Sequence, residues 1–339
     1  MNVVHSSVTA DFRVQWMSVM TIHEVWYGDS VAGKVVRIAL LPLSWLYALG
    51  WHVYLFSYKL GFKKPYKASC KVFCIGNFSS GGTGKTPTVV FVAKCLRELG
   101  VPFAIGCSGY GAPHSVGASI APEGALNATE WGDEPSEIRE LLPEVPLIVG
   151  RARVVAAKLC EENFPGSVLL MDDGFQHMPL AKDISLILDP ETSNSFTFPA
   201  GPYREPRRTG KKRADLVVPG SQFLHHFSGL SFNSVDGSSI AAPTNARIIT
   251  GIGRPDKFKA ALEAAGVAIS EFIAFPDHDK LAVDLAEKGG ELPWVVTRKD
   301  WVKLSLHCDP SKVKIIIADR TATIEPVDEF KKWLKIKLG

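Results

Sequence analysis

The clearest chemistry in this sequence lies in a glycine-rich stretch, CIGNFSSGGTGKT, at residues 74–86. Glycines let backbone N–H groups close around a polyphosphate, and the N-terminus of a following helix favours its negative charge. The residues expected to bind ATP are Ser80, Gly81, Gly82, Thr83, Gly84, Lys85 and Thr86. Lys85 would reach the β- and γ-phosphates, and the Thr86 hydroxyl would take a place on Mg²⁺. Because Ser79 replaces the first glycine of the usual pattern, a ligand-free turn before a helix is the alternative.

A pair of aspartates follows an apolar run later in the chain. Residues 167–177 read SVLLMDDGFQH, which matches a buried strand that ends in two carboxylates. A carboxylate at such a strand tip binds Mg²⁺ directly or through water. An ordinary turn is the alternative, but the upstream phosphate loop favours a metal site at Asp172 and Asp173. Gln176 and His177 would then lie at the mouth of the site.

Three weaker signals stay open on the residues alone. Asp133 and Glu134 precede a predicted helix, and either could simply cap it. Arg151 and Arg153 could hold a phosphate or lie in solvent. Six basic side chains between residues 204 and 213 could bind a phosphorylated substrate or an anionic lipid, and a solvated basic loop is the alternative.

Alternating strands and helices predict a parallel sheet that positions these residues. We expect an α/β fold: a P-loop NTPase-like parallel-sheet domain, a smaller C-terminal α/β domain and an N-terminal membrane-associating helix. The expected division is an extension at 1–19, a helical segment at 20–66, the P-loop kinase domain at 67–219, a connector at 220–245 and the smaller domain at 246–339. The connector shows no strong periodicity, and the smaller domain is expected to end in a basic amphipathic helix at 327–338.

One apolar stretch near the N-terminus indicates contact with lipid. Between Ile38 and Phe56 there is no Asp, Glu, Lys or Arg, and the run approaches the ~20 residues that a spanning helix needs. Aromatic residues lie within it and lysines follow it, as at a membrane interface. A buried core helix is the alternative, and Pro42 and His52 weaken the case for full spanning.

Composition excludes several classes of function. The 339 residues carry a net charge of only +3, so a nucleic-acid partner is not expected. The six cysteines are scattered without a Cys-x-x-Cys pair, which argues against a zinc site or a disulfide framework.

Taken together, the motifs resemble those of a known family. GNFSSGGTGKTP, GYG, WGDEP, DDGFQH, AGPYREP, TGIGRP and FPDHD occur in the order seen in tetraacyldisaccharide 4′-kinase, the lipid A pathway kinase of Gram-negative bacteria. The resemblance runs from about Ile22 to the C-terminus. It implies transfer of the ATP γ-phosphoryl group to the 4′-hydroxyl of a tetraacyl glucosamine disaccharide 1-phosphate, giving lipid IV-A. It also implies contact with inner-membrane lipid at the cytoplasmic face of that membrane.

The resemblance also implies roles for individual residues. Asp133 matches the family's catalytic carboxylate, which acts with a histidine at the position of His278, while Lys85 binds the transferring phosphate. Thr86, Asp172 and Asp173 carry over as the Mg²⁺ site. The positions expected near the disaccharide or the nucleotide are Tyr110, Arg153, Gln176, His177 and Glu205.

Three departures from the family pattern affect rate and affinity more than reaction class. Ser108 replaces an arginine, Arg298 replaces a glutamate, and Asp279 replaces a second histidine. Two other functions stay open: a family member that the missing arginine has made weakly active and, from another class of protein, a membrane-bound P-loop nucleotide switch. The sequence contains no Asn-Lys-x-Asp motif, which counts against a GTPase.

Overall fold

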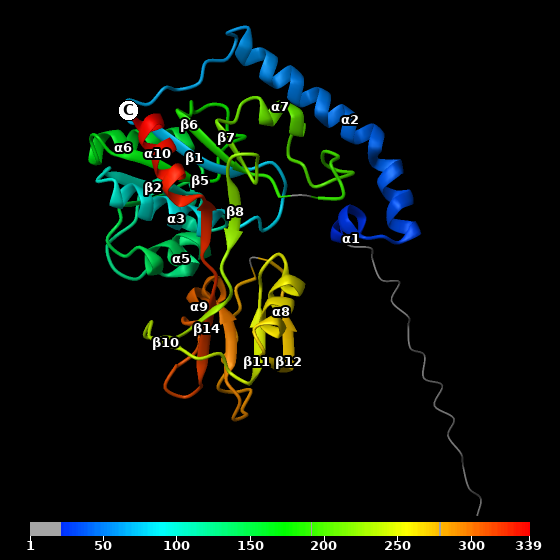
Figure 1. Cartoon of the computed structure of the whole chain (residues 1–339), viewed down its shortest axis with the longest axis vertical. Coiled ribbons are helices and arrows are strands. Elements are labelled where there is room, and N and C mark those ends of the chain that lie inside the picture. The colour runs from blue at the N-terminus through cyan, green and yellow to red at the C-terminus, as the bar shows by residue number, and fades with distance from the viewer. Residues whose placement is uncertain (1–21, 191, 278) are drawn as a thin grey trace, which may run out of the picture.

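The computed structural model describes residues 22–190, 192–277 and 279–339. The expected extension 1–19 and the candidate residue His278 lie outside these ranges. The described chain forms two α/β units, with a long helix along the edge of one of them (Figure 1).

The first unit is built on a seven-stranded sheet within the described residues, in the order β3-β4-β2-β5-β1-β6-β7. Its strands are β1 (Val72–Asn77), β2 (Phe103–Cys107), β3 (Ser119–Ile120), β4 (Leu147–Val149), β5 (Val168–Asp172), β6 (Ile184–Leu188) and β7 (Leu216–Val218). All neighbours pair in parallel except β3 and β4, so the expected parallel sheet is confirmed.

Helices cover both faces of this sheet. They are α3 (Lys85–Glu98), α4 (Ala128–Trp131), α5 (Asp133–Leu141), α6 (Arg153–Asn163) and α7 (Arg207–Lys211), with a short 3₁₀ helix, η1 (Pro113–Ser115). Alternate residues of β1 enter two separate cores: Phe73 packs with α3 and α5, whereas Cys74 packs with α6. Because both faces are buried, the strands are apolar runs rather than alternating patterns.

The second unit contains a six-stranded sheet within the described residues, in the order β10-β9-β14-β13-β11-β12. Its strands are β9 (Ser231–Ser234), β10 (Ser239–Ile240), β11 (Asn245–Thr250), β12 (Ala268–Ala274), β13 (Trp294–Thr297) and β14 (Ile315–Asp319), and its helices are α8 (Pro255–Ala264) and α9 (Arg298–Leu304). A separate antiparallel pair, β8 (Leu224–Phe227) and β15 (Ala322–Glu325), carries the chain between the two units (Figure 1).

Two expectations about this half of the chain need correction. The connector 220–245 contains β8, β9 and β10, and the last two extend the second sheet. The C-terminal helix, α10 (Val327–Leu338), does not pack in the smaller unit: Phe330 and Leu334 are buried in the core beside α3 of the first sheet. Short edge strands are held by backbone pairing to distant partners, so they carry little apolar periodicity of their own.

The N-terminal segment forms α1 (Ile22–Tyr27) and α2 (Val31–Lys59). By length and composition α2 could cross a membrane, which is weak support for membrane association because it is a single helix near the N-terminus. Within α2, Gly33 and Ser44 are buried, and most of its large apolar side chains are exposed. The alternative of a buried core helix is therefore wrong for the described chain. Figure 1 shows α2 running along the outer edge of the first unit.

Candidate functional site

The glycine-rich loop connects β1 to α3 at the carboxyl edge of the first sheet. The φ angles of Gly81 (106°) and Gly84 (82°) lie in the left-handed region, which a side chain would oppose. Gly84 also has no room for a Cβ atom, which would lie 2.2 Å from the Phe227 ring of β8. The loop is tied to its strand by a 3.0 Å hydrogen bond from Asn77 Nδ2 to Thr83 Oγ1.

The structure brings the two sequence motifs together. Strand β5 pairs with β1, so Asp172 lies beside the start of α3. The Thr86 hydroxyl donates a 2.9 Å hydrogen bond to Asp172 Oδ2. Asp173 has two cationic neighbours, because its Oδ2 atom lies 2.8 Å from Arg204 Nη1 and 3.7 Å from Lys85 Nζ.

The two aspartates have opposite electrostatic surroundings. Burial raises the pKa of Asp172 to about 7, and the negative charges of Glu134 and Asp173 reinforce this against Lys85. Burial would also raise the pKa of Asp173, but Lys85 and Arg204 hold it well below the usual range of a carboxyl group. Asp172 is thus a buried acid for which burial and the neighbouring acids outweigh Lys85, and Asp173 is an ion-paired carboxylate.

The oxygen donors at this edge fit a hard divalent cation. Mg²⁺ in kinase sites needs only one or two protein oxygens beside the substrate phosphates. Asp172 and Thr86 offer a carboxylate and a hydroxyl side by side, and a cation would relieve the buried charge of Asp172. Asp173 is a less available ligand, since Arg204 and Lys85 already neutralise it. Within the described ranges, no group of three or more His, Cys, Asp or Glu side chains is placed to hold a metal by protein atoms.

Asp133 lies where the two units meet. Gly132, with φ 97°, turns the chain into α5, and the Asp133 side chain is buried at the first turn of that helix. Its Oδ2 atom lies 3.5 Å from Nζ of Lys299, in α9 of the second unit, and Lys299 Nζ is also 3.3 Å from Asp277 Oδ1. A second ion pair, 3.0 Å from Arg298 Nη1 to Glu140 Oε2, joins the same two helices.

Lys299 is the site residue that motif reasoning missed. It follows Arg298, one of the positions at which the chain departs from the family pattern. The family motif at this place could have drawn attention to Lys299. No signal in the sequence pairs this lysine with Asp133, which lies 166 positions away (299 − 133).

The candidate substrate residues have different surroundings. Gln176 Nε2 donates 3.0 Å hydrogen bonds to Asn77 O and to Glu205 Oε1, so these two candidates lie together at the base of the phosphate loop. Arg153 is buried and donates to Asp172 O at 3.2 Å, which holds the end of β5.

Tyr110 and His177 are the other two candidates, and different side chains lie near each of them. Tyr110 is exposed, and the Arg151 guanidinium lies over its ring, 5.8 Å from the ring centroid. Burial and the nearby charges of Lys182 and Arg153 lower the pKa of His177 to about 4, so its imidazole is neutral at neutral pH.

Comparison with known proteins identifies the family. The family model described as tetraacyldisaccharide-1-P 4′-kinase matches residues 36–339. The chain is 34% identical to the tetraacyldisaccharide 4′-kinase of Shewanella sediminis, over 80% of this chain and 83% of that one. It is 31% identical to the enzyme of the same name from Syntrophus aciditrophicus, over 70% of this chain and 76% of that one. The chain belongs to the tetraacyldisaccharide 4′-kinase family.

A solved member of this family has the same fold. It is LpxK from Aquifex aeolicus, described as an "apo" form in complex with ATP, with a TM-score of 0.76 and 26% identity. The match covers 89% of this chain and 99% of that one. The expected fold class and the expected enzyme class, an ATP-dependent kinase, are therefore confirmed, and the nucleotide switch is not favoured.

Proposed function

We propose that this kinase transfers the γ-phosphoryl group of ATP to the 4′-hydroxyl of a tetraacyl glucosamine disaccharide 1-phosphate and so forms lipid IV-A. The observation that carries the proposal is the 2.9 Å contact between Thr86 and Asp172, which joins the phosphate loop to the acidic strand end. Membership of the tetraacyldisaccharide 4′-kinase family supports the choice of acceptor.

In the proposed reaction, the chain binds and orients the triphosphate through the loop. Backbone N–H groups of residues 80–84 and the ammonium group of Lys85 stabilise negative charge on the transferring phosphoryl group. The 3.7 Å ion pair between Lys85 and Asp173 supports this role, because it lies at the carboxyl end of β5, next to the loop. Thr86 and Asp172, and less directly Asp173, would hold Mg²⁺, which would supply positive charge to the phosphates of the bound nucleotide.

Asp133 is the proposed base for the acceptor. A sugar hydroxyl is a weak nucleophile, so a carboxylate that accepts its proton lowers the barrier as the bond to phosphorus forms. The buried position of Asp133 and its contact with Lys299 support this role, because a neighbouring cation keeps a carboxylate ionised. The assisting role of His278 follows from the family motif.

The acceptor is proposed to reach the site from the membrane. Helix α2 exposes Leu43, Leu46 and Leu49 to the surroundings, and acyl chains could cover them. Since ATP is cytosolic, we place this helix at the cytoplasmic face of the bacterial inner membrane.

The test is a transfer assay with purified protein in detergent, γ-labelled ATP and the disaccharide 1-phosphate. Label on the lipid supports the proposal, whereas label released only as inorganic phosphate would support a nucleotide switch and contradict it. Lys85→Met should abolish transfer. Lys94→Met is the matched control, because Lys94 is exposed on the same helix, α3.

A further inference from the structure

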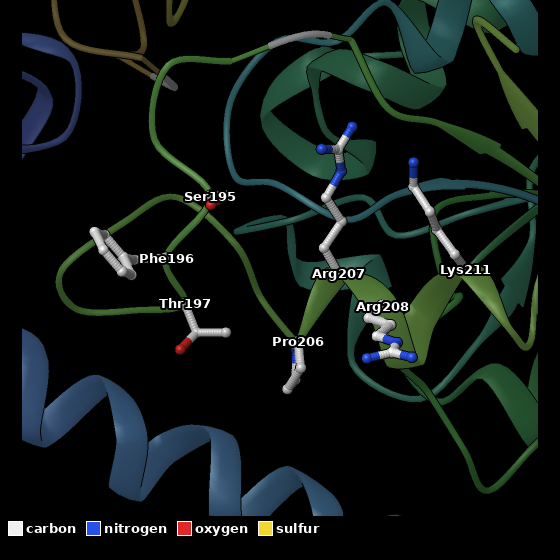
Figure 2. A pocket seen from close by; sticks show the side chains of 7 residues that line it. All are labelled: Ser195, Phe196, Thr197, Pro206, Arg207, Arg208 and Lys211. Carbon is white, nitrogen blue, oxygen red and sulfur yellow. The ribbon is translucent and has the colours of Figure 1, made fainter.

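A pocket of about 540 Å³ opens beside α2, outside the phosphate loop (Figure 2). It is lined by Ser195, Phe196, Thr197, Pro206, Arg207, Arg208 and Lys211. Phe196 and Thr197 form one wall and the basic side chains come from α7 on the other, with α2 passing alongside Thr197 (Figure 2). This is the basic segment for which the sequence left an anionic lipid, a phosphorylated substrate and a solvated loop open.

The pocket has excess positive charge. The buried carboxylate of Asp189 forms ion pairs with Arg207, at 2.7 Å from Nε, and with Lys211, at 3.2 Å from Nζ. Arg208 is exposed, and within the described ranges its side chain has no hydrogen-bond or ion-pair partner. Among the residues that the structure describes, three cationic side chains line the pocket and one carboxylate, Asp189, contacts two of them, so an occupant should be an anion.

The apolar surroundings show what kind of anion fits. Ser44 in the middle of α2 donates a 2.8 Å hydrogen bond to Thr197 O, and Thr197 Oγ1 returns one of 3.0 Å to Ser44 O. The pocket wall is thus fastened to the helix that exposes apolar side chains, and the Phe196 and Phe198 rings beside it are 42% and 47% exposed. A charged head beside an exposed apolar face suits an amphiphile better than a free ion.

The same segment supports the phosphate loop. Ser80 N donates to Pro202 O at 2.8 Å, and Arg204 N donates to Phe78 O at 2.8 Å. Gly210 in α7 has no room for a Cβ atom, which would lie 2.5 Å from the Phe78 ring. A group bound in the pocket would therefore be held at a fixed position relative to the ATP site.

We propose that this pocket binds the phosphate group of a membrane lipid whose acyl chains lie along α2. The lipid is either the acceptor, through its own 1-phosphate, or an anionic phospholipid of the bilayer. The first source rests on the proposed function, and the second does not.

The test compares Arg208→Glu with Lys212→Glu. Both residues are exposed and both changes reverse one charge, but Lys212 does not line the pocket. Arg208→Lys, which keeps the charge, should behave like the unaltered protein. Circular dichroism of each variant checks that the fold is intact.

The first arm measures binding to lipid vesicles and does not depend on kinase activity. Full-length protein is floated with phosphatidylcholine vesicles, with or without phosphatidylglycerol. The measured quantity is the increase in vesicle-bound protein when phosphatidylglycerol is added. If bilayer phospholipid occupies the pocket, Arg208→Glu should reduce this increase about tenfold more than Lys212→Glu does. Binding to vesicles of phosphatidylcholine alone measures the contribution of the apolar helix α2, and neither variant should change it.

The second arm measures KM in detergent without phospholipid, for the acceptor with and without its 1-phosphate. If the acceptor occupies the pocket, Arg208→Glu raises KM about tenfold for the phosphorylated acceptor only. Equal behaviour of Arg208→Glu and Lys212→Glu in both arms would overturn the proposal. Failure of the unaltered protein to phosphorylate the acceptor would instead overturn the proposed function, and the vesicle arm would still decide the pocket.

Discussion

Lys299 in α9 lies 3.5 Å from Asp133 in α5, so a cation of the second unit faces the proposed base of the first. Burial alone would lower the pKa of Lys299, but Asp133 and Asp277 raise it above its usual range. Glu134 and Glu137 also face this ammonium group and act in the same direction. Lys299 therefore stays charged at any pH at which the enzyme would work.

Replacing Lys299 by methionine should impair the base without affecting nucleotide binding. A carboxylate that loses a neighbouring cation holds its proton more tightly, so the acidic limb of the kcat profile should move to higher pH. The KM for ATP should stay within about twofold of its original value, since Lys299 lies on the other unit from the phosphate loop. Lys299→Arg keeps the charge and is the control; an unmoved acidic limb in Lys299→Met would remove this role.

Asp133→Ala should keep ATP binding and lose most phosphoryl transfer. Loss of a general base costs about 10²- to 10⁴-fold in rate, and the phosphate loop is left intact. Single-turnover transfer of label measures the rate, and a fluorescent ATP analogue measures binding. Glu130→Ala, an exposed change in α4, is the control. Near-normal turnover of Asp133→Ala would show that another group accepts the proton.

Ser108→Arg tests whether the departure from the family pattern weakens this enzyme. The Ser108 hydroxyl donates a 3.3 Å hydrogen bond to Glu134 Oε2, so an arginine here would bring a guanidinium next to an acidic site. An added charge-assisted contact to a phosphate should raise kcat/KM about fivefold. Unchanged or lower activity would mean that the chain already compensates for the missing arginine. The control is Ser119→Arg, which adds the same charge in the edge strand β3.

Glu137 makes stability depend on pH. Burial and the neighbouring acids Asp133, Asp319 and Glu134 raise its pKa to about 8, although Lys299 opposes them. Between its usual pKa of about 4.5 and 8 the folded chain holds a proton that the unfolded chain has lost, so this group lowers stability as pH rises through that window.

Glu137→Gln should therefore raise the midpoint of thermal unfolding at pH 8 by about 2 °C and change it little at pH 4.5. Thermal unfolding followed by circular dichroism at both pH values is the measurement. Glu144→Gln is the control, because Glu144 is a largely exposed carboxyl. An equal change at both pH values would contradict the assignment.

Local motifs predicted which segments meet at the carboxyl edge of the first sheet. The glycine spacing of residues 81–84 and the apolar run before Asp172 are properties of short segments, and parallel strands bring their carboxyl ends to one edge. The contact between Thr86 and Asp172 follows from that rule once β5 pairs with β1.

The contacts between segments that are distant in the sequence could not be predicted from local motifs. Nothing near Phe330 indicates that α10 packs on the first sheet, and nothing near Asp173 indicates that Arg204 and Lys85 neutralise it. The candidate phosphate loop can thus be recognised from a few adjacent residues, because a glycine-rich loop needs only its own backbone. The partner of Asp133 and the place of α10 depend on how two sheets pack, since an ion pair or a buried face exists only when a remote segment supplies the other half.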